Sequence, residues 1–493
     1  MTDRTRVVVI GAGMVGHRFT EELHRLDPSV DITLLGEEEY EPYNRILLTE
    51  LLAGRVDLAG LTMSAHDESV TVRLGSPALE IDRERKVVVT AGDSVPYDHL
   101  VLATGARGRV IPVPGLRDGL PRGAHVLRSL NDARDIKAAA LNARHAVVIG
   151  GGPLGLEAAT ALRHRGVGVT VLSLESSLLD RDLDPAVAAI VEAGAGDLGI
   201  EFLGGVAIES VAVGNGQVTA VHLGDGRKIE SQLLVLAAGV VPETSLASAA
   251  GLETAQGIVV GHDLRTTLDG SISAIGDCAQ TPTGTSGLVA PGWAQARELA
   301  RNLVHGTLLE PVEITGSAMK LKAVGLDVVT MGRRASNADS HDRVVNLRDA
   351  SARRHVEVVV RDDTLIGVTC VGAPEIAAHL STQFDRPGMI PTDPLQLLLG
   401  TSAGAVTEAV NPTTMPSSTT VCRCNGVSKG DLVREWENGC TTVESLAEKT
   451  LATTGCGGCT SLVCGIVDWL TEVDPPTPHD SSQPEGRRVG LNA

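Results

Sequence analysis

The sequence has little of three things that would point to particular ligands or partners. Aromatic residues make up 2% of its 493 residues, so no planar ligand can be assumed to stack on tryptophan or tyrosine. Basic residues are outnumbered, and the net charge of −19 argues against nucleic acid as a partner. No apolar run approaches the ~20 residues that a membrane span needs, so we expect no membrane segment. The longest run, around residues 233–241, has the length of a buried strand.

The N-terminus also lacks room for a signal peptide, because the first hydrophobic strand begins within six residues. We therefore expect a cytoplasmic protein. In that compartment the eight cysteines are better explained as metal ligands or redox groups than as disulfides. Hydrophobic residues at 43% and charged residues at 21% describe a globular chain, whose length suits three or four domains.

A glycine-rich turn between a hydrophobic strand and an amphipathic helix lies at residues 7–16, VVVIGAGMVG. Gly11 and Gly13 allow the backbone to turn tightly and to approach a pyrophosphate, and Gly16 lets the helix pack closely. The first helical amides, beginning at Met14, then face the phosphates. The pattern predicts a dinucleotide site.

A second strand, residues 31–35, follows that helix and ends near Glu37, where a carboxylate can hold a ribose. At the N-terminus of a protein with two nucleotide sites, such a unit usually holds FAD. Thr104 and Gly105, in the small-residue turn ATG that ends a later strand, are further candidate cofactor contacts.

The same pattern returns in HAVVIGGGPLGLEAATALRHRG, which begins at His145. Its second strand, residues 168–172, ends at Ser173 instead of a carboxylate. The turn AAG at residues 237–239 echoes ATG, which makes Gly239 a candidate contact. The glycines that correspond to those of the first copy are Gly150, Gly152 and Gly155.

The two copies indicate an α/β protein with two nested Rossmann-like nucleotide-binding domains, followed by a small α+β domain and a small helical module. Strand signals between residues 318 and 372 support the α+β domain, and residues 411–420 have the composition of a linker. The expected division is residues 1–115 and 240–308 for the first nucleotide domain, 116–239 for the second, 309–405 for the α+β domain, 406–420 for the linker, 421–475 for the module and 476–493 for a disordered tail.

The module contains four cysteines in a CxC pair and a CxxC pair, with 31 residues between the pairs. Four thiolates grouped two and two match a [2Fe–2S] cluster, in which each iron takes two sulfurs. Structural zinc is the alternative, since four thiolates suit it too. We favour the cluster, because an upstream flavin needs a one-electron exit. The candidate ligands are Cys422, Cys424, Cys456 and Cys459.

Helix starts surround these ligands. Ser428 with Asp431, and Thr441 with Glu444, have the spacing of helix N-terminal caps, and Cys459 is expected to open a third helix. The remaining thiols look structural: Cys440 and Cys464 as bystanders, Cys370 as a buried strand residue, and Cys278 as a single packed thiol. No dithiol pair follows either glycine motif, which argues against a flavin–disulfide mechanism.

Longer stretches carry a resemblance to a known family. VVVIGAGMVGHRF, GEEEYEPYNRILLTELLAG, VIGGGPLGLEAA, LVAPGWAQA and KLKAVGLDVVTMG resemble the N-terminal portion of the large subunit of NADH-dependent nitrite reductase. They equally resemble the flavoprotein electron-transfer subunit of bacterial assimilatory nitrate reductase. The ending, VCRCNGVSKGDL to TGCGGC, is similar to the family's bacterioferritin-associated-ferredoxin-like [2Fe–2S] module.

The resemblance implies FAD in the first nucleotide domain and NAD(P)H in the second. It implies that Asp277, next to Gly276, binds the ribityl or phosphate region of the flavin. Asn44 and Arg45 would lie beside the isoalloxazine, and Glu157 near the nicotinamide; Arg45 and Glu157 are the candidate catalytic residues. The chain departs from the family in carrying Asp277 where Glu is frequent. It also ends before the sirohaem domain, so it is not expected to reduce nitrite by itself.

We therefore expect an NAD(P)H dehydrogenase that delivers single electrons to a molybdenum nitrate reductase or a sirohaem nitrite reductase subunit. A homodimer is a further candidate assembly. NADH is favoured, because Glu175 would repel a 2′-phosphate and no Lys or Arg precedes Arg181 in this loop. The alternatives are a reductase for a small ferredoxin or rubredoxin, and a regulatory or docking module with structural zinc.

Overall fold

The structure, a computed structural model, describes residues 4–306, 318–384, 390–391, 393–398, 412–413, 415–417, 419–422, 427–453 and 459–474. The chain forms two compact units, Met1–Gly404 and Ala405–Ala493, called here the N-terminal and C-terminal units. Cys424 and Cys456 lie outside the described residues.

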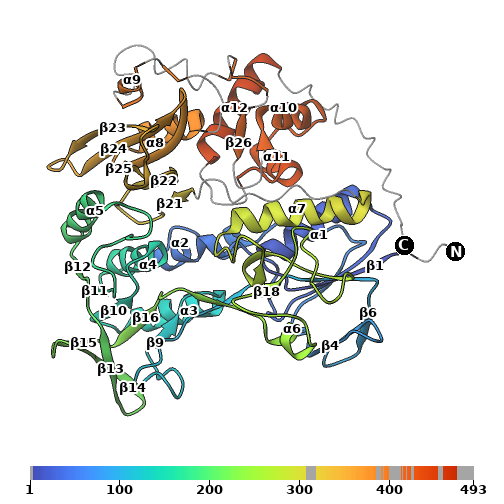
Figure 1. Ribbon diagram of the computed structural model, residues 1–493, viewed down its shortest axis with the longest axis horizontal. Helices are drawn as coiled ribbons and strands as arrows, with labels where there is room; N and C mark the ends of the chain where they lie inside the picture. The colour runs from blue at the N-terminus through green and yellow to red at the C-terminus, as the bar shows by residue number, and fades with distance from the viewer. Residues whose placement is uncertain are drawn as a thin grey trace, which may run out of the picture. The chain divides into compact units, whose positions relative to one another are not determined.

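A five-stranded parallel sheet, in the order β19-β7-β1-β2-β3, forms one core of the N-terminal unit (Figure 1). Its central strands are apolar runs buried on both faces, as parallel sheets require. Because β19 lies far along the chain, residues on both sides of the second nucleotide motif complete this sheet. The strands are β1 (Arg6–Ile10), β2 (Asp31–Leu35), β3 (Thr71–Arg73), β7 (His99–Leu102) and β19 (Ile272–Ala274).

A second parallel sheet, in the order β12-β11-β10-β16-β9, forms a separate core. One face packs against helices α4 (Pro153–His164) and α5 (Pro185–Asp197). The other packs against the antiparallel strands β13 (Ile208–Gly214), β14 (Gln217–Leu223) and β15 (Lys228–Glu230). The parallel strands are β9 (Ala124–Val126), β10 (His145–Ile149), β11 (Gly168–Leu172), β12 (Ile200–Leu203) and β16 (Leu233–Leu236). The predicted nucleotide-binding fold class is confirmed by these two sheets.

Smaller elements join the two sheets and extend them. An antiparallel ribbon of β8 (Ala106–Gly108) and β17 (Val240–Pro242) lies where the chain leaves the first sheet and returns to it. The other elements are α2 (Leu48–Ala53), α3 (Leu130–Ala140), α6 (Ser245–Ala249), β4 (Glu80–Asp82), β5 (Val87–Val89), β6 (Ser94–Pro96), β18 (Ile258–Val259) and β20 (Ala279–Gln280).

Helices α1 (Met14–Leu26) and α7 (Val289–His305) lie side by side on the first sheet (Figure 1). The buried Trp293 of α7 donates its indole N–H to the carbonyl of Met14 at 3.0 Å. The amide oxygen of Gln295 accepts the backbone N–H of Gly276 at 2.8 Å. One helix therefore fixes both the start of α1 and the loop that carries Asp277.

A five-stranded antiparallel sheet, in the order β21-β22-β25-β24-β23, follows in the N-terminal unit. Helices α8 (Pro374–Phe384) and α9 (Leu395–Leu398) cover one of its faces. Cys370 is 1% exposed in this sheet, as predicted. The strands are β21 (Met319–Lys320), β22 (Val328–Gly332), β23 (Arg343–Asp349), β24 (Arg354–Arg361) and β25 (Thr364–Val371).

The described residues of the C-terminal unit form three helices, as the cysteine module was expected to have. The predicted cap of α10 is confirmed, because Ser428 and Asp431 exchange backbone and side-chain hydrogen bonds. The predicted cap at Thr441 is wrong by one residue, because Thr442 caps α11 through the N–H of Ser445. The elements are β26 (Thr420–Cys422), β27 (Val427–Ser428), α10 (Lys429–Glu437), α11 (Val443–Thr450) and α12 (Thr460–Val473).

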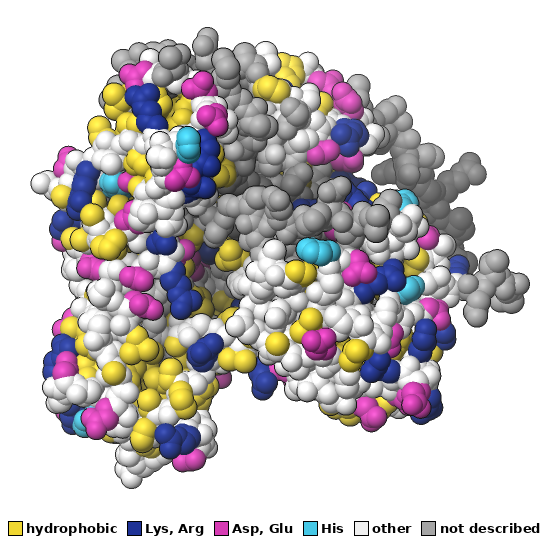
Figure 2. Space-filling model, in the orientation of Figure 1, with side chains coloured by type: hydrophobic (Ala, Val, Ile, Leu, Met, Phe, Trp, Pro, Cys, Tyr) yellow, Lys and Arg dark blue, Asp and Glu magenta, His cyan; other side chains and the backbone are white. Residues whose placement is uncertain are grey.

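The described helices include none that is both long and apolar enough to cross a membrane. On the face drawn in Figure 2, Lys and Arg side chains alternate with Asp and Glu side chains. That face therefore presents no extended field of one sign, of the kind that attracts nucleic acid.

Ionisable side chains of α1 and of the segment around His66 form a hydrogen-bonded group. Nδ1 of the fully buried His17 lies 2.8 Å from Nε2 of His66, and its Nε2 lies 3.3 Å from Oε1 of Glu21. The Ser64 hydroxyl donates to the same oxygen of Glu21 at 2.7 Å. Burial, followed by the charge of His17, lowers the pKa of His66 to about 4. His66 is therefore a neutral hydrogen-bond partner at neutral pH.

Acid should destabilise the protein through His66. Its pKa in the folded state, about 4, lies below the ordinary 6.5, so the unfolded chain binds the proton more readily between these values. Stability then falls as pH drops through this window, by about 2 kcal/mol at pH 5. The melting temperature of the N-terminal unit should fall less between pH 7.5 and pH 5 in His66→Gln than in the wild type. The exposed His262→Gln is the control; an equal fall in both variants would contradict this assignment.

Candidate functional site

The turn between β1 and α1 has two positions that only glycine can occupy. A Cβ on Gly11 would lie 2.2 Å from the carbonyl oxygen of Ala103, and a Cβ on Gly16 would lie 2.0 Å from that of Gly11. Gly13 differs, because the nearest atom to a Cβ there is Nε of Arg45 at 3.9 Å. Gly13 is the N-cap of α1 and provides no side-chain hydrogen bond to it. The first amides of α1 are thus free to hold an anion, which the helix dipole also favours.

The turn between β10 and α4 repeats this construction. A Cβ on Gly150 would lie 2.3 Å from the carbonyl oxygen of Ala237, and a Cβ on Gly155 would lie 2.0 Å from that of Gly150. A Cβ on Gly152 would meet no atom within 4 Å. Gly152 occupies the N-cap position of α4, and no side chain bonds to the first amides of that helix. Two open helix starts therefore lie at the carboxyl ends of two parallel sheets, where nucleotides bind.

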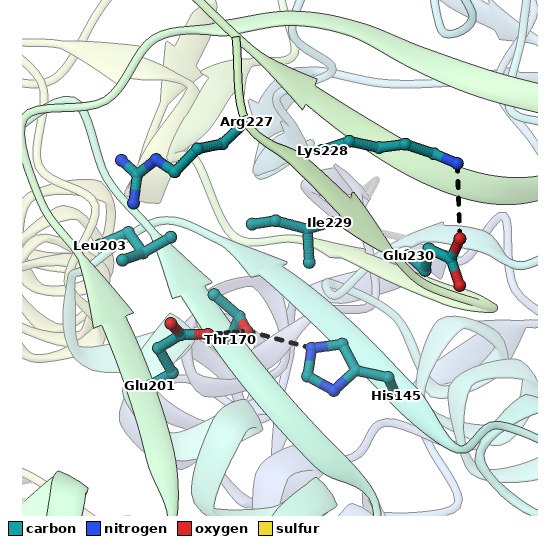
Figure 3. Close-up of a pocket in the computed structure, with 8 residues that line it drawn as sticks. All are labelled: His145, Thr170, Glu201, Leu203, Arg227, Lys228, Ile229 and Glu230. Atoms are coloured by element: carbon teal, nitrogen blue, oxygen red, sulfur yellow. Dashed lines mark hydrogen bonds and ion pairs between the residues drawn. The ribbon is translucent and has the colours of Figure 1, made fainter. Parts of the chain in front are cut away.

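A hollow of about 440 Å³ lies elsewhere on the second sheet, between its strands and the hairpin of β14 and β15 (Figure 3). His145, on its wall, is the first residue of β10, whereas Gly150 follows the last residue of that strand. On β10, the residue that lines the hollow is therefore at the opposite end of the strand from the glycine turn.

Charged residues gather around the first glycine turn. Arg45 forms an ion pair with Glu38, which also accepts the Tyr43 hydroxyl at 2.8 Å. Glu37, the predicted ribose ligand, is exposed just beyond the end of β2. Asn44 is buried at the N-cap of the short 3₁₀ helix Arg45–Leu47, and its side chain accepts the N–H of Ile46. The guanidinium of Arg45 is thus held beside the turn; its predicted position beside an isoalloxazine stays a prediction.

Asp277 forms an ion pair with Arg128, whose Nη2 lies 2.5 Å from its Oδ2. Arg128 also donates to the carbonyl of Ala106 at 3.1 Å and accepts, through its own carbonyl, from Arg45 at 3.5 Å. Arg128 was not among the predicted site residues, although it directly precedes the helix cap at Ser129. Two arginines and Asp277 therefore stand near the same turn, which suits a ligand with both phosphate and hydroxyl groups.

The remaining predicted contacts of the two small-residue turns lie near the ribbon of β8 and β17. The Thr104 hydroxyl donates to the carbonyl of Glu243 at 2.8 Å, so it holds the ribbon in this structure. Gly105 and Gly239 have φ of +71° and +93°, which favours glycine at both positions. They lie at the two ends of the segment that contains the second sheet. A Cβ on either would meet no atom within 4 Å.

Glu157 is 6% exposed in the first half of α4, and its two oxygens are held by different segments. Oε2 accepts the hydroxyl of Thr49 on α2 at 2.8 Å. Oε1 accepts the backbone N–H of Lys322 at 2.9 Å and lies 3.3 Å from its ammonium. Lys322 was not among the predicted site residues, although it lies within the KLKAVGLDVVTMG stretch. The antiparallel-sheet region thus supplies the charge that balances Glu157.

The end of β11 places Ser173 against the second glycine turn. Its hydroxyl lies 3.2 Å from where a Cβ on Gly151 would be, and it accepts the N–H of Glu175 at 3.1 Å. Glu175 and Leu174 are exposed, and Arg181 is exposed further along the loop. The backbone of Glu175 is therefore held by Ser173 while its side chain is exposed to solvent, and the predicted contact of these residues with a ribose stays a prediction.

Two of the four predicted cluster ligands are described. Cys422 is 2% exposed in β26, and Cys459 is 8% exposed at the N-cap of α12, where it was expected to open a helix. The backbone N–H of Thr453 donates to Sγ of Cys459 at 3.3 Å, a contact that stabilises a thiolate. Among the described residues, no three His, Cys, Asp or Glu side chains are arranged to hold a metal ion.

Cys278 has the packed environment expected of a structural thiol. It is fully buried, and its sulfur donates to the carbonyls of Leu102 and Ile275. Burial raises its pKa, so it is not a ready nucleophile.

Two family models match the chain. The model described as pyridine nucleotide-disulphide oxidoreductase matches residues 5–298, and the BFD-like [2Fe-2S] binding domain matches residues 420–469. The assimilatory nitrate reductase electron transfer subunit of Bacillus subtilis is 31% identical over 485 residues, which cover 96% of this chain and 61% of that protein. The nitrite reductase [NAD(P)H] large subunit of Klebsiella oxytoca is 33% identical over 481 residues, 94% of this chain and 49% of that protein. The chain thus spans about half to three fifths of these relatives.

Solved structures share the fold. The covalent complex of putidaredoxin reductase with putidaredoxin contains a chain that aligns with a TM-score of 0.70 at 26% identity, covering 82% of this chain and 98% of that one. With two uncapped glycine turns and the paired cysteines, these matches make the chain an oxidoreductase that uses FAD and NAD(P)H and carries a [2Fe–2S] domain. It belongs to the pyridine nucleotide-disulphide oxidoreductase family.

Proposed function

We propose that the protein takes electrons from NAD(P)H and delivers them, through FAD and the [2Fe–2S] cluster, to a partner reductase of nitrate or nitrite assimilation. The observation that carries this proposal is the presence, in one chain, of two open helix starts and a thiolate module. Two relatives that are similar along nearly the whole chain are named for nitrate and nitrite reduction. The partner is a molybdenum nitrate reductase or a sirohaem nitrite reductase subunit, and the location is the cytoplasm.

The proposed domains follow the sheets. The first sheet belongs to the FAD-binding domain, residues 1–115 and 240–308, and the second to the NAD(P)H-binding domain, residues 116–239. Residues 309–405 form the α+β domain, and residues 421–475 form the cluster domain after a linker. The strands β7 and β19 pair in one sheet although the second sheet lies between them in sequence, which supports this discontinuous division.

The residues around the first turn are proposed to hold FAD. The amides of α1 and the guanidinium group of Arg128 would bind the pyrophosphate, because two sources of positive charge meet there, and Arg45 would lie beside the isoalloxazine with Asn44. Glu37 would bind the ribose, and Asp277 the ribityl chain after releasing Arg128. When bound, FAD accepts a hydride from NAD(P)H and passes electrons singly to the cluster.

Around the second turn, the amides of α4 would hold the NAD(P)H pyrophosphate, and Glu157 would lie near the nicotinamide. Hydride transfer depends on the alignment of two rings and requires no proton from a side chain. The proposed role of Glu157 is therefore to position the nicotinamide. Thr49 and Lys322 hold both of its carboxylate oxygens, so its side chain is fixed beside the proposed ring site. Lys322 also offsets the cost of burying that carboxylate.

A second candidate is a reductase for a small soluble ferredoxin, because the chain is 29% identical to a solved ferredoxin reductase from Rhodopseudomonas palustris and covers 91% of it. The two functions are separated by offering the purified holoprotein, with NADH, either a nitrate reductase or a ferredoxin. Turnover of the nitrate or nitrite enzyme supports the first proposal, and turnover of the ferredoxin alone supports the second. Iron and zinc analysis tests the further alternative of a zinc module.

The two glycine turns can be told apart by substitution. Gly13→Val should fold, since its backbone is extended and the space around it is open, but the side chain blocks the pyrophosphate. The purified variant should be colourless. Gly152→Val should retain FAD and raise the KM for the pyridine nucleotide. Gly270→Val, at an exposed glycine with equally open surroundings, is the control. Loss of FAD in Gly152→Val alone would mean that the two cofactors are exchanged.

The exit path can be tested at the cysteines. Cys456→Ser should lose the cluster and electron delivery to the partner while it keeps NADH-dependent dye reduction, because the flavin is reduced upstream. Cys440→Ser, at a predicted bystander, should keep the cluster, as measured by iron content and visible absorbance. If dye reduction in Cys456→Ser disappears while FAD stays bound, the proposed relay is wrong.

Coenzyme preference should be modest. One partly solvated charge contact is worth about 1 kcal/mol, less than tenfold in affinity. We expect NADH to be preferred over NADPH in kcat/KM by no more than that factor. Glu175→Ala should narrow the preference and Ser173→Asp should widen it, since they remove and add a carboxylate at the ribose. A wild-type preference for NADPH, or an unchanged ratio in Glu175→Ala, would refute this explanation.

A further inference from the structure

Two arginine side chains come together where the helices α1 and α7 lie side by side (Figure 1). Both helices start at the carboxyl ends of strands of the first sheet, α1 after β1 and α7 beside the end of β19. They therefore run in the same direction from the contact between Trp293 and the carbonyl of Met14. One turn beyond that contact, Arg297 of α7 and Arg18 of α1 are neighbours. In keeping with this, burial first and then the charge of Arg18 lower the pKa of Arg297.

The guanidinium groups of this pair have more donors than acceptors. Arg18 is 6% exposed, and its Nη2 bonds to Oε1 of Glu22 at 2.8 Å. Its Nε and Nη1, and Nη1 of Arg297, are buried and have no hydrogen-bond partner among the described residues. Buried donors in proteins are nearly always bonded, to a protein group, a water or an ion. An acceptor is therefore missing between two neighbouring cations.

The carboxylates on α1 do not supply this acceptor, because their oxygens contact other groups. Oε1 of Glu22 contacts Arg18, while its Oε2 accepts Nε and Nη2 of Arg25 at 3.3 and 2.7 Å. Glu21, which also lies near Arg18, uses Oε1 for Nε2 of His17 at 3.3 Å. Arginines thus outnumber carboxylates here, although the chain as a whole has a net charge of −19.

We propose that Arg18 and Arg297 bind a small tetrahedral oxyanion, for which inorganic phosphate is the representative ligand. A guanidinium group presents its N–H donors in a planar fork, which matches the oxygen atoms of a phosphate. A phosphate has enough oxygen atoms to accept all of the unpartnered donors at once, and its charge balances the excess of arginine. Arg297 is half-buried, so the pair can be reached from solvent along its side chain.

A bound anion would also act on the glycine turn nearby. The pair lies one turn along α1 from Met14, the first residue of the helix whose amides face the proposed FAD pyrophosphate. The anion ties α1 to α7 at a second place, beyond the bond between Trp293 and Met14. We therefore expect it to slow the release of FAD. This consequence rests on the proposed FAD site, whereas binding of the anion does not.

Titration of phosphate into the full-length holoprotein tests the site. FAD is bound, and NAD⁺ is present at saturation so that the second glycine turn is filled. Binding is measured by calorimetry, with chloride keeping the ionic strength constant. The wild type should bind phosphate, and Arg297→Gln should bind it about tenfold more weakly or worse. Arg297→Lys should also lose affinity, because it keeps the charge without the planar fork.

The matched control is Arg301→Gln, which removes the same charge one turn further along α7. Arg301 pairs with Glu298 at 2.7 Å and is half exposed, so its loss should leave the affinity for phosphate unchanged. An equal loss in Arg301→Gln and Arg297→Gln would show a general effect of charge and overturn the proposal. Retained FAD absorbance in the variants shows that they are folded.

A second measurement follows the release of FAD from the wild type on dilution. Phosphate should slow the release, whereas the same ionic strength of sodium chloride should not, and Arg297→Gln should be insensitive to phosphate. A wild type that does not bind phosphate, or an Arg297→Gln variant that binds it as well as the wild type, would overturn the anion site. Phosphate binding that leaves FAD release unchanged would overturn only its link to the flavin.

Discussion

The structure depends on two close backbone contacts, that of Gly11 with the Ala103 carbonyl and that of Gly16 with Gly11. They bring the end of β1, the end of β7 and the start of α1 together so tightly that no side chain fits between them. Neighbouring elements preserve this geometry, since α7 ties the start of α1 through Trp293 and the Asp277 loop through Gln295. The open amides of α1 are therefore a property of the core, and not of a flexible loop.

The buried carboxylate of Glu157 is bound by residues from two distant parts of the chain. A buried carboxylate is costly unless it is paired and hydrogen-bonded. Here α2 provides a hydroxyl, while Lys322 provides a backbone N–H and an ammonium. The antiparallel-sheet region is thereby joined to the nucleotide-binding region by chemistry as well as by packing, which explains why it belongs to the same compact unit.

The glycine turns and their strands could be predicted from the sequence, because a buried parallel strand is a continuous apolar run and its turn needs glycine at fixed spacing. The contacts of Arg128 with Asp277 and of Lys322 with Glu157 could not be predicted. In each pair the two residues are far apart in sequence, and no local sequence pattern indicates that they meet. The cap of α11 differs by one residue from the prediction because two adjacent threonines offer the same hydroxyl group, and the sequence pattern does not show which of them bonds to Ser445. Cys424 and Cys456 rest on spacing and family resemblance, since they lie outside the described residues.

The ribbon of β8 and β17 has a consequence for how such proteins diversify. The chain leaves the first sheet along one of these strands and returns along the other, so both covalent connections to the second sheet run through this one ribbon. A segment joined in this way can be exchanged for another without rerouting the strands of the first sheet. If the pyridine nucleotide binds in that segment, as proposed, its binding site can change while the strands of the first sheet keep their order.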